Sequence, residues 1–491
     1  MEFITYEMFG AVGNGAADDM PAIVKAHEEA NKLNLPVKAR EGATYYIAPI
    51  GRTAIVQTST DWTGAKFIID DVGVEEFRKP VFDVTSKLEP AELKMEKLDR
   101  GTAFIENPFG CDLHVMVYNE NHKDYIRRGV NQSSGQGRRD NFVVRADGTL
   151  ISPVSFQFDE ITGLIANPIP KDKLVIRGGE FTTIANQAES KYTYHTRNIN
   201  IGRSNVEICE VKHYVTGELD HGAPYYGFIA VNNCSFVEIH DCLFTGHKLY
   251  WTVLDSGLPS PMGTYDLIFG MASNVTVARC KQTTDIMDRD YWGLIGSNFT
   301  RDFVMEDCDF SRYDAHCGVT NCTLRRCKLG HQCLNTIGFG TFIVEDTEAY
   351  GGAMVGLRGD YGSTWRGDII IRNSVWKPMG AGRSIFAGEN DGMHDFGYEC
   401  FMPQNIIIDG LTIIENDQAD ASVPLTVFND YSVVSKWTND NFSDEQASED
   451  APRPFMPVPP VSVEVKNIRT ERELQLCVNP ALMPDAKFIR E

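Results

Sequence analysis

Long apolar runs and a targeting signal are both missing from this sequence of 491 residues. No window approaches the roughly 18 consecutive apolar residues that a membrane-spanning helix needs, so we expect no membrane partner. Residues 1–6 lack the basic head and the apolar middle of a secretory signal peptide. We therefore expect a cytoplasmic protein if Met1 is the native start, and a secreted or periplasmic protein if a leader has been removed.

Positive charge is also scarce, with 46 Lys and Arg residues against 68 Asp and Glu residues and a net charge of -22. A chain of this charge has no general affinity for phosphate backbones, so we expect no nucleic-acid partner. Its 12 cysteines are far below the density of a disulfide scaffold, and none has zinc-finger spacing. Hydrophobic residues make up 42% of the chain, which is enough for a large buried core.

One amphipathic helix is predicted near the N-terminus, between Asp19 and Leu33. Asp18 or Asp19 can accept hydrogen bonds from the first turn, and Pro21 suits a position whose own N–H has no helical partner. Apolar residues recur at helical spacing at Ile23, Ala26, Ala30 and Leu33. Pro36 follows the last of them and ends the helix.

Short runs of β-branched and other apolar residues repeat along the middle of the chain. They begin at residues 173, 205, 236, 274, 302, 321, 341, 368 and 405. Each run alternates apolar with polar positions, as half-buried strands do. The intervals vary in length but never fall below 19 residues. This pattern predicts an all-β solenoid in which each coil is one repeat and the insertions lie in loops.

Four cysteines occupy one position of this repeat: Cys242, Cys280, Cys308 and Cys327. In stacked coils these side chains would lie above one another. Because free cysteine commonly behaves as a small buried hydrophobic residue, we expect an interior ladder of thiols rather than a metal or redox site.

Four regions are expected along the chain. Residues 1–50 are the N-terminal opening and the capping helix, and residues 51–170 hold the first coils together with an inserted subdomain. Within the latter, the charged and Gln/Ser/Gly-rich stretch 88–170 is interpreted as that subdomain or as long loops. Residues 171–430 are the central coils with the cleft. Residues 431–491 are a C-terminal excursion, proline-rich over 436–460, followed by last strands that include 461–465.

Polar and aromatic residues gather beside a second strand-like run in each coil. Neighbouring parallel strands lie about 4.8 Å apart, so carboxylates one or two coils apart would lie within roughly 5–10 Å, as a glycosidase acid/base pair requires. We expect the catalytic residues to be Asp290, Asp314, His316, His331 and Arg358. We expect the substrate-binding residues to be His247, Trp251, Asp288, Tyr291, Trp292, Tyr313, Asp360, Tyr361 and Trp365.

Simpler roles are open for the same residues. Asp288 and Asp290 can serve only to bond backbone N–H groups in turns, as aspartate commonly does in loops. The aromatic residues can be ordinary packing residues, although exposed rings beside carboxylates suit the C–H faces of sugars.

The segment from Phe9 to Ile23 resembles the "FGAxGDGxxDDxxAI" opening of the pectate-lyase and polygalacturonase superfamily. Phe9, Gly10, Ala11, Gly13, Gly15, Asp18, Asp19, Ala22 and Ile23 fit this opening. Later in the chain, Asp290, Asp314, Gly330 and His331 match polygalacturonase motif residues by type and order. The resemblance implies a right-handed parallel β-helix with an N-terminal capping helix, and a carbohydrate as substrate.

We therefore predict a carbohydrate-active enzyme that cleaves glycosidic bonds of a polysaccharide or oligosaccharide by hydrolysis. Asp290 and Asp314 would be the acid and the base, and no cofactor would be needed. One alternative is a polysaccharide lyase, in which Arg358 or a bound calcium ion neutralises a uronate while Tyr291, His316 or His331 moves protons. Another alternative is a non-catalytic glycan-binding β-helix, because fold does not fix function.

Overall fold

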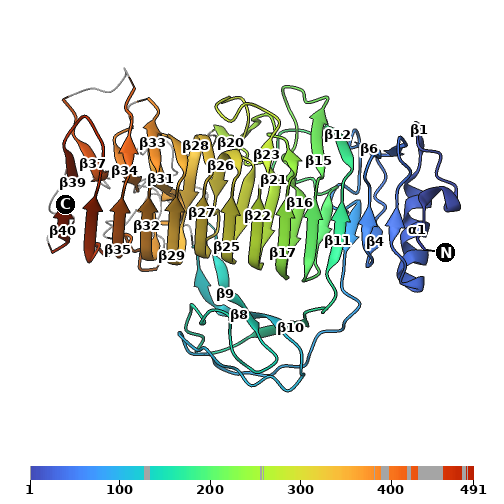
Figure 1. Cartoon of the computed structure of the whole chain (residues 1–491), viewed down its shortest axis with the longest axis horizontal. Helices are drawn as coiled ribbons and strands as arrows, with labels where there is room; N and C mark the ends of the chain where they lie inside the picture. The colour runs from blue at the N-terminus through green and yellow to red at the C-terminus, as the bar shows by residue number, and fades with distance from the viewer. Residues whose placement is uncertain are drawn as a thin grey trace.

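The computed structural model describes residues 2–126, 133–254, 257, 259–380, 382–388, 398–416, 422–429, 457–477, 483 and 485–490. Its coils stack side by side into an elongated body, with the N-terminus at one end and the C-terminus at the other (Figure 1). In the described part of the chain, no helix has the length and apolar character needed to cross a membrane.

The first face of the stack is a parallel sheet of 13 strands that pair in chain order. Its strands are β2 (Val37–Lys38), β5 (Thr60–Asp61), β11 (Leu174–Arg177), β14 (Val206–Cys209), β17 (Ser235–His240), β22 (Ser273–Ala278), β25 (Thr300–Glu306), β27 (Val319–Arg325), β29 (Gly338–Glu345), β32 (Trp365–Arg372), β35 (Asn405–Asp409), β38 (Ser462–Lys466) and β40 (Lys487–Arg490). Each repeat run found in the sequence supplies one of these strands, from β11 to β35. The predicted repeat is therefore confirmed.

A second parallel sheet of 22 strands forms the other two faces. One row of pairings joins β1 (Asn14–Asp18), β3 (Thr44–Ile47), β6 (Lys66–Asp70), β12 (Glu180–Ile184), β15 (Lys212–Thr216), β18 (Leu243–Phe244), β23 (Lys281–Gln282), β26 (Asp309–Asp314), β28 (Lys328–Thr336), β30 (Glu348–Gly351), β33 (Val375–Pro378) and β36 (Thr412–Ile413). The other row joins β4 (Ala54–Val56), β7 (Phe82–Val84), β13 (Ile199–Ile201), β16 (Tyr226–Asn232), β21 (Tyr265–Gly270), β24 (Ile295–Asn298), β31 (Ala353–Leu357), β34 (Ser384–Ala387), β37 (Leu425–Phe428) and β39 (Leu474–Cys477). The strands β26 and β28 belong to both rows, because each pairs with strands of both.

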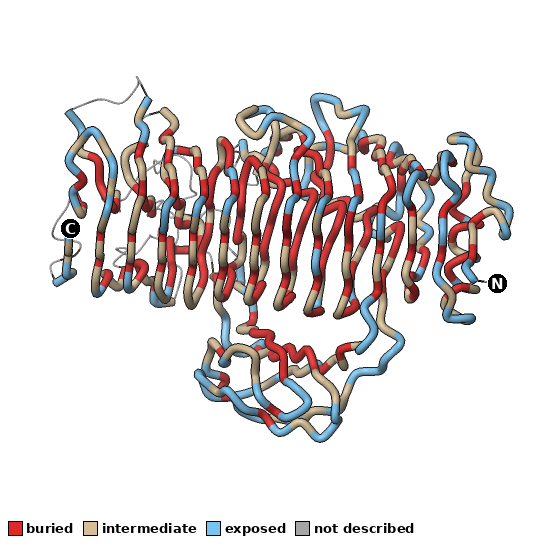
Figure 2. Tube along the Cα trace, viewed as in Figure 1, coloured by how far each residue is buried: buried red, intermediate tan, exposed pale blue. Residues whose placement is uncertain are grey.

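Buried side chains from all three faces form one continuous core. Figure 2 shows the buried residues running along the coils. Strand β35 shows the pattern, with Ile406 and Ile408 buried between more exposed neighbours. Where a coil turns into the 13-stranded sheet, Asn205, Asn274 and Asn321 adopt left-handed φ angles of 61°, 54° and 56°. Asparagine tolerates this conformation better than most residues, which explains its use at the start of these three repeats.

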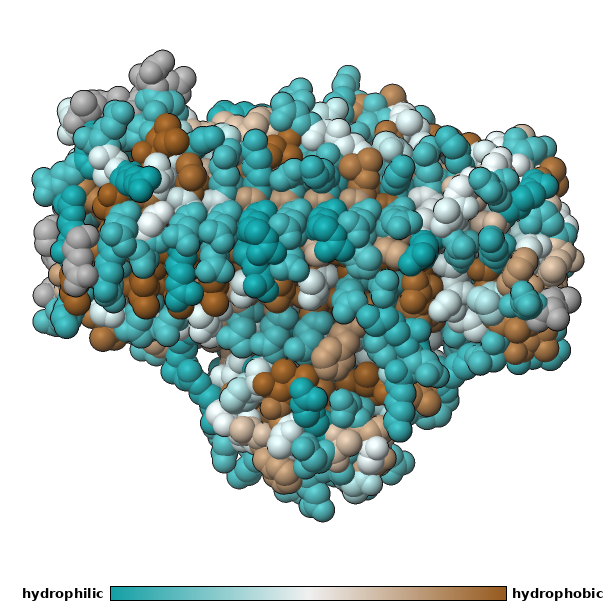
Figure 3. Space-filling view, viewed as in Figure 1, coloured by the Kyte–Doolittle hydropathy of each residue, from teal (hydrophilic) through white to brown (hydrophobic). Residues whose placement is uncertain are grey.

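The thiol ladder predicted from the repeat is also confirmed. Cys242, Cys280, Cys308 and Cys327 are all buried and all free of disulfides. The Cys280 N–H lies 3.4 Å from the Cys308 sulfur in the next coil. Outward positions carry polar residues instead, which form rows of hydrophilic side chains across the coils on the face seen in Figure 3.

The N-terminal end of the stack is covered by η1 (Tyr6–Phe9) and α1 (Met20–Leu33). Asp18 accepts a hydrogen bond from the Met20 N–H, and Asn34 ends the helix in the left-handed conformation. The helix buries Ile23, Ala26 and Ala30 against the first coils, so the predicted capping helix is confirmed.

Residues between β7 and β11 leave the stack and form a separate antiparallel sheet with its own apolar core, seen below the coils in Figure 1. Its strands are β8 (Leu113–Asp124), β9 (Gln136–Val144) and β10 (Gly163–Pro168). Arg301 of β25 is 1% exposed and donates hydrogen bonds to the Pro153 carbonyl (2.7 and 3.0 Å) and to Ser155. These contacts hold the subdomain against the middle coils.

Two sequence expectations concern the C-terminal region. The predicted strand at 461–465 is present as β38, and a further strand, β40, pairs with it one coil further on. Most of the proline-rich excursion at 436–460 lies outside the described residues. A short antiparallel pair, β19 (Trp251–Val253) and β20 (Pro259–Pro261), and the turn η2 (Gly359–Tyr361) complete the described elements.

Candidate functional site

A cavity of about 860 Å³ opens beside β16, β21 and β24, between the coils and the β9 strand of the subdomain. This size lies within the range of small-molecule sites. Tyrosines recur along its wall, so we call it the tyrosine groove. Its aromatic side chains are Tyr192, Tyr194, Tyr226, Tyr265, Trp292, Phe299 and Tyr361. Its polar side chains include Gln136, Arg139, Asn298, His316, Arg358 and Asp360.

Four of the predicted site residues meet at one end of this groove. His316 follows β26, and its Nδ1 lies 3.3 Å from the Asn298 side-chain oxygen. Its Nε2 lies 3.5 Å from the Tyr361 hydroxyl. Arg358 and Asp360 form a two-fold hydrogen-bonded pair at 2.7 and 3.0 Å. The stacking of β26, β28 and β31 brings these residues together across about 40 positions of sequence.

Asp314 lies behind this group and is fully buried. Arg358 Nη1 lies 2.9 Å from both of its oxygens, Arg312 Nη2 lies 2.9 Å from one of them, and the Tyr265 hydroxyl donates to it at 2.7 Å. Burial alone would raise the pKa of Asp314, but the two guanidinium groups outweigh burial and hold the pKa below its ordinary value. Asp314 is therefore an ionised anchor for the arginines rather than a proton donor.

Asp290 and Asp314 do not meet in the groove, contrary to the sequence expectation, and neither is among its described lining residues. Asp290 is exposed, precedes β24 in a turn, and is not among the described lining residues. Its N–H donates to the Asp288 carboxylate at 3.0 Å, which is the turn role held open for this pair. The physical reason is loop length, because the connection from β23 to β24 carries Asp290 away from the strand position that Asp314 occupies in β26.

His331 and Tyr291 contact each other outside the groove lining. His331 Nε2 lies 3.2 Å from the Tyr291 carbonyl oxygen. Burial lowers the pKa of His331. The neighbouring Gly330 is required here, because a Cβ at this position would lie 1.9 Å from the Ile286 carbonyl oxygen.

Three aromatic residues expected to bind substrate lie elsewhere. Tyr313 and Trp365 are both 0% exposed and pack in the core, so the prediction is corrected to a packing role for both. Both rings point inward because they fall on core-facing strand positions. Trp251 is 54% exposed on β19, outside the described groove lining.

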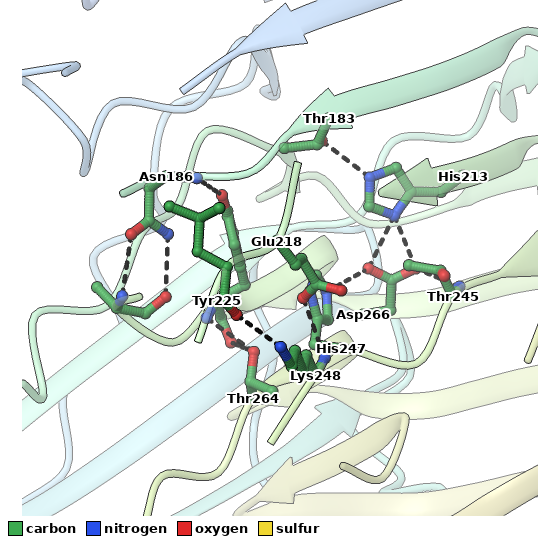
Figure 4. A network of polar contacts seen from close by, with 12 residues as sticks. Thr183, Asn186, His213, Glu218, Tyr225, Thr245, His247, Lys248, Thr264 and Asp266 are labelled. Atoms are coloured by element: carbon green, nitrogen blue, oxygen red, sulfur yellow. Dashed lines mark hydrogen bonds and ion pairs between the residues drawn. The ribbon is translucent and has the colours of Figure 1, made fainter. Parts of the chain in front are cut away.

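His247 is also buried rather than exposed to a substrate, and it belongs to a polar network shown in Figure 4. Asp266 of β21 lies between two histidines, at 2.8 Å from His213 Nδ1 and 3.1 Å from His247 Nε2. The Thr245 N–H also donates to Asp266, at 2.9 Å, and Glu218 lies 3.8 Å from His247 Nδ1.

The charges of this network follow from its geometry. Burial alone would lower the pKa of His247, but Asp266 and Glu218 outweigh burial and raise the pKa to about 9. Burial alone would raise the pKa of Asp266, but the two histidines lower it. Burial lowers the pKa of His213 despite its contact with Asp266. His247 is therefore the histidine that carries the positive charge paired with Asp266.

One cluster has the donor types of a metal site: Glu207, Cys209 and His240, on adjacent coils and away from the groove. Lys173 forms an ion pair with Glu207 at 3.5 Å, which places positive charge beside it.

In the groove, Asp360 is the single carboxylate among the described lining residues. That donor set does not match the six to eight oxygens that calcium prefers.

Several groove residues were not identified from the sequence. They are Arg139, Tyr192, Tyr194, Tyr226 and Tyr265. Tyrosines stand close together in the sequence at Tyr192/Tyr194 and Tyr225/Tyr226, between the repeat strands. These pairs are a sequence signal for an aromatic surface. Arg139 gives no such signal, because it lies in the subdomain and reaches the groove only through the fold.

No protein-family model and no curated protein sequence matches this chain. Solved structures do match it over nearly its whole length. The tailspike of Pseudomonas phage phi297 matches with a TM-score of 0.56 at 10% identity, over 97% of this chain and 82% of the tailspike. The chain is a right-handed parallel β-helix.

Two further tailspikes share this β-helix. The tailspike of Pseudomonas phage LKA1 matches with a TM-score of 0.53 at 14% identity, over 99% of this chain and 84% of that chain. The tailspike of Acinetobacter baumannii bacteriophage AP22, solved in complex with A. baumannii capsular saccharide, matches with a TM-score of 0.54 at 11% identity, over 99% of this chain and 79% of that chain. At these identities the similarity is one of fold.

Proposed function

We propose that this β-helix binds a polysaccharide in the tyrosine groove and cleaves it there. The observation that carries the proposal is the row of aromatic rings beside His316, Arg358 and Asp360. Sugar rings pack their C–H faces on aromatic surfaces, and polar side chains between the rings fix their orientation. The saccharide-bound AP22 tailspike supports this proposal, because its β-helix has the same fold.

The groove chemistry favours elimination over hydrolysis by a pair of aspartates. Hydrolysis of the predicted type needs two carboxylates about 5–10 Å apart, whereas Asp360 is the single carboxylate among the described lining residues. Elimination needs a cation to neutralise a uronate carboxylate and a base to remove a proton. The arginines of the groove lining supply the positive charge, and the adjoining His316 and Tyr361 supply the proton-transfer groups.

In this reaction the proton at C5 of the uronate passes to the His316–Tyr361 pair. The C4–O4 bond breaks and a C4=C5 double bond forms. The departing oxygen takes up a proton and becomes a free hydroxyl on the released sugar. No oxidant or reductant is required.

The test is a screen of acidic and neutral polysaccharides for new reducing ends and for the ultraviolet absorbance of an unsaturated uronate. Elimination predicts that both signals appear together, and that His316→Ala abolishes both while leaving the melting temperature unchanged. His331→Ala is the matched control, because His331 does not line the groove, and it should stay near full activity. Reducing ends without the absorbance would refute elimination, and binding without either signal would refute cleavage.

A further inference from the structure

The inserted subdomain supplies part of the groove wall. Strand β9 packs against β22 and β25, and its residues Gln136 and Arg139 line the groove together with the aromatic side chains of the coils. Figure 1 shows β8 and β9 meeting the stack at its middle coils. A ligand in the groove would therefore contact the subdomain as well as the β-helix.

The guanidinium group of Arg139 is held in a fixed orientation. It lies over the ring of Phe299 at 5.1 Å and over the ring of Tyr118 at 5.6 Å. Its Nε donates a hydrogen bond to the Gly137 carbonyl at 3.1 Å. Stacking on two rings leaves the edge of the guanidinium plane available, and that edge is the part that bonds a carboxylate with two parallel hydrogen bonds.

The two arginines among the described lining residues differ in charge balance. Arg358 is matched by Asp314 and Asp360 at 2.7–2.9 Å. The carboxylate recorded nearest Arg139 is Glu120, at 3.8 Å, and the Glu120 side chain is 54% exposed. Such an exposed pair contributes little and yields readily to another anion. Arg139 is thus the lining arginine whose positive charge remains available to a ligand.

The net charge of -22 does not prevent an anion from binding at this position. At physiological salt, charges more than about 8 Å apart are largely screened. A guanidinium in direct contact with the ligand acts at about 3 Å, well inside that distance. Local contact therefore outweighs the overall charge of the chain.

We infer that Arg139 binds a carboxylate of the glycan, so that the inserted subdomain makes the groove selective for uronate-containing chains. This inference rests on the proposed function, because it assigns the substrate class of the same groove. Arg139 acts here as a specificity residue at the subdomain wall, while the proton-transfer groups lie at the His316 end.

The test uses uronate tetrasaccharides (galacturonate, guluronate and glucuronate) and their carboxyl-reduced forms, with binding measured by calorimetry on the full chain. The wild type should bind at least one charged form about 10-fold to 100-fold more tightly than its reduced form, the range of a charge-assisted hydrogen bond. Arg139→Gln should lose this preference and still bind the reduced form as the wild type does. Arg139→Lys should keep part of it, because a lysine retains the charge but not the two-fold geometry.

Arg138→Gln is the matched control. Arg138 is the neighbouring residue on β9, but it is bonded to Asp124 at 2.9 and 3.1 Å and does not line the groove. This variant should keep the wild-type preference. In the wild type, the preference should also shrink as salt is raised, a measurement that needs no variant to fold.

The outcomes separate the inference from the proposed function. Equal wild-type binding of charged and reduced forms would overturn the role of Arg139 while leaving glycan binding intact. An undiminished preference in Arg139→Gln would also overturn it. A wild type that binds none of the polysaccharides or tetrasaccharides would overturn the proposed function and this inference together.

Discussion

Replacing Asp266 with asparagine should destabilise the protein strongly without changing its shape. Asp266 is fully buried, and it is the shared partner of His213, His247 and the Thr245 N–H. Asparagine has nearly the same volume, so packing is kept while the negative charge is lost. The positive charge of His247 would then be left buried, with Glu218 at 3.8 Å as its remaining ion-pair partner among the described residues.

The expected cost is about 3–5 kcal/mol, which is the range for removing one partner of a buried ion pair. Urea denaturation of the full chain, followed by tryptophan fluorescence, measures it as a loss in the free energy of unfolding. Buried tryptophans such as Trp62 and Trp376 report the loss of the core.

Asp241→Asn is the matched control for this measurement. Asp241 also contacts a histidine, His240 at 2.7 Å, and pairs with Arg279, but its side chain is 42% exposed. Surface pairs of this kind contribute about 0–1 kcal/mol. A loss below about 1 kcal/mol in Asp266→Asn, equal to that of Asp241→Asn, would refute the conclusion that this network holds a buried charge pair.

Three further predictions follow from the core and its charges. The folded pKa of His247 is about 9, against 6.5 for an unperturbed histidine, so its contribution of about 3 kcal/mol to the free energy of unfolding is fully present below pH 6.5 and is lost as pH rises through 9. Urea titrations of His247→Gln should lack this decline. An unchanged decline in the variant would contradict the assignment of the charge to His247. In native protein, a thiol reagent should label the half-buried Cys111 and Cys317 first. It should label the ladder thiols only on unfolding, because burial keeps them neutral and inaccessible. Fast labelling of the ladder thiols in native protein would contradict their burial in the core. Gly367→Ala should lower the free energy of unfolding by about 1–3 kcal/mol, because its Cβ would lie 2.1 Å from a carbonyl oxygen of the adjacent coil. Gly352→Ala is the control, because a Cβ at Gly352 would meet nothing within 4 Å. Equal melting temperatures for the two variants would refute this reasoning.

The coil architecture was predictable because its determinants are local and repeated. Several repeats begin with an asparagine or aspartate in the left-handed conformation, such as Asn274, Asp302 and Asn321. Alternating apolar residues follow, and both features recur in the sequence. The buried cysteines follow from the same frame. An error at one coil does not spread to the next, because each repeat can be recognised by itself.

The groove was less predictable because its walls come from distant segments. Arg139 lies in the subdomain, yet its guanidinium lies over the ring of Phe299, a contact that spans about 160 residues. The position of Asp290 failed for a related reason. Loops of unequal length separate the strands of successive coils. Residues at the same sequence distance from a repeat strand therefore do not always occupy the same position on the stacked coils.

Asp314 shows which further step would have improved the prediction. Asp314 lies on β26, and its environment depends on Arg312, two residues earlier on the same strand, and on Arg358. Strand register pairs Asp314 with Asn335 and Asn335 with Gly356 in the following coils. Arg358 follows Gly356 by two residues and so lies close to this row of aligned residues. The ionisation and pairing of a carboxylate in a β-helix therefore depend on charged side chains aligned with it in neighbouring coils, and on those two residues away from these aligned positions. By that rule the charge of Asp314 is already neutralised by Arg312 and Arg358 before any ligand enters the groove.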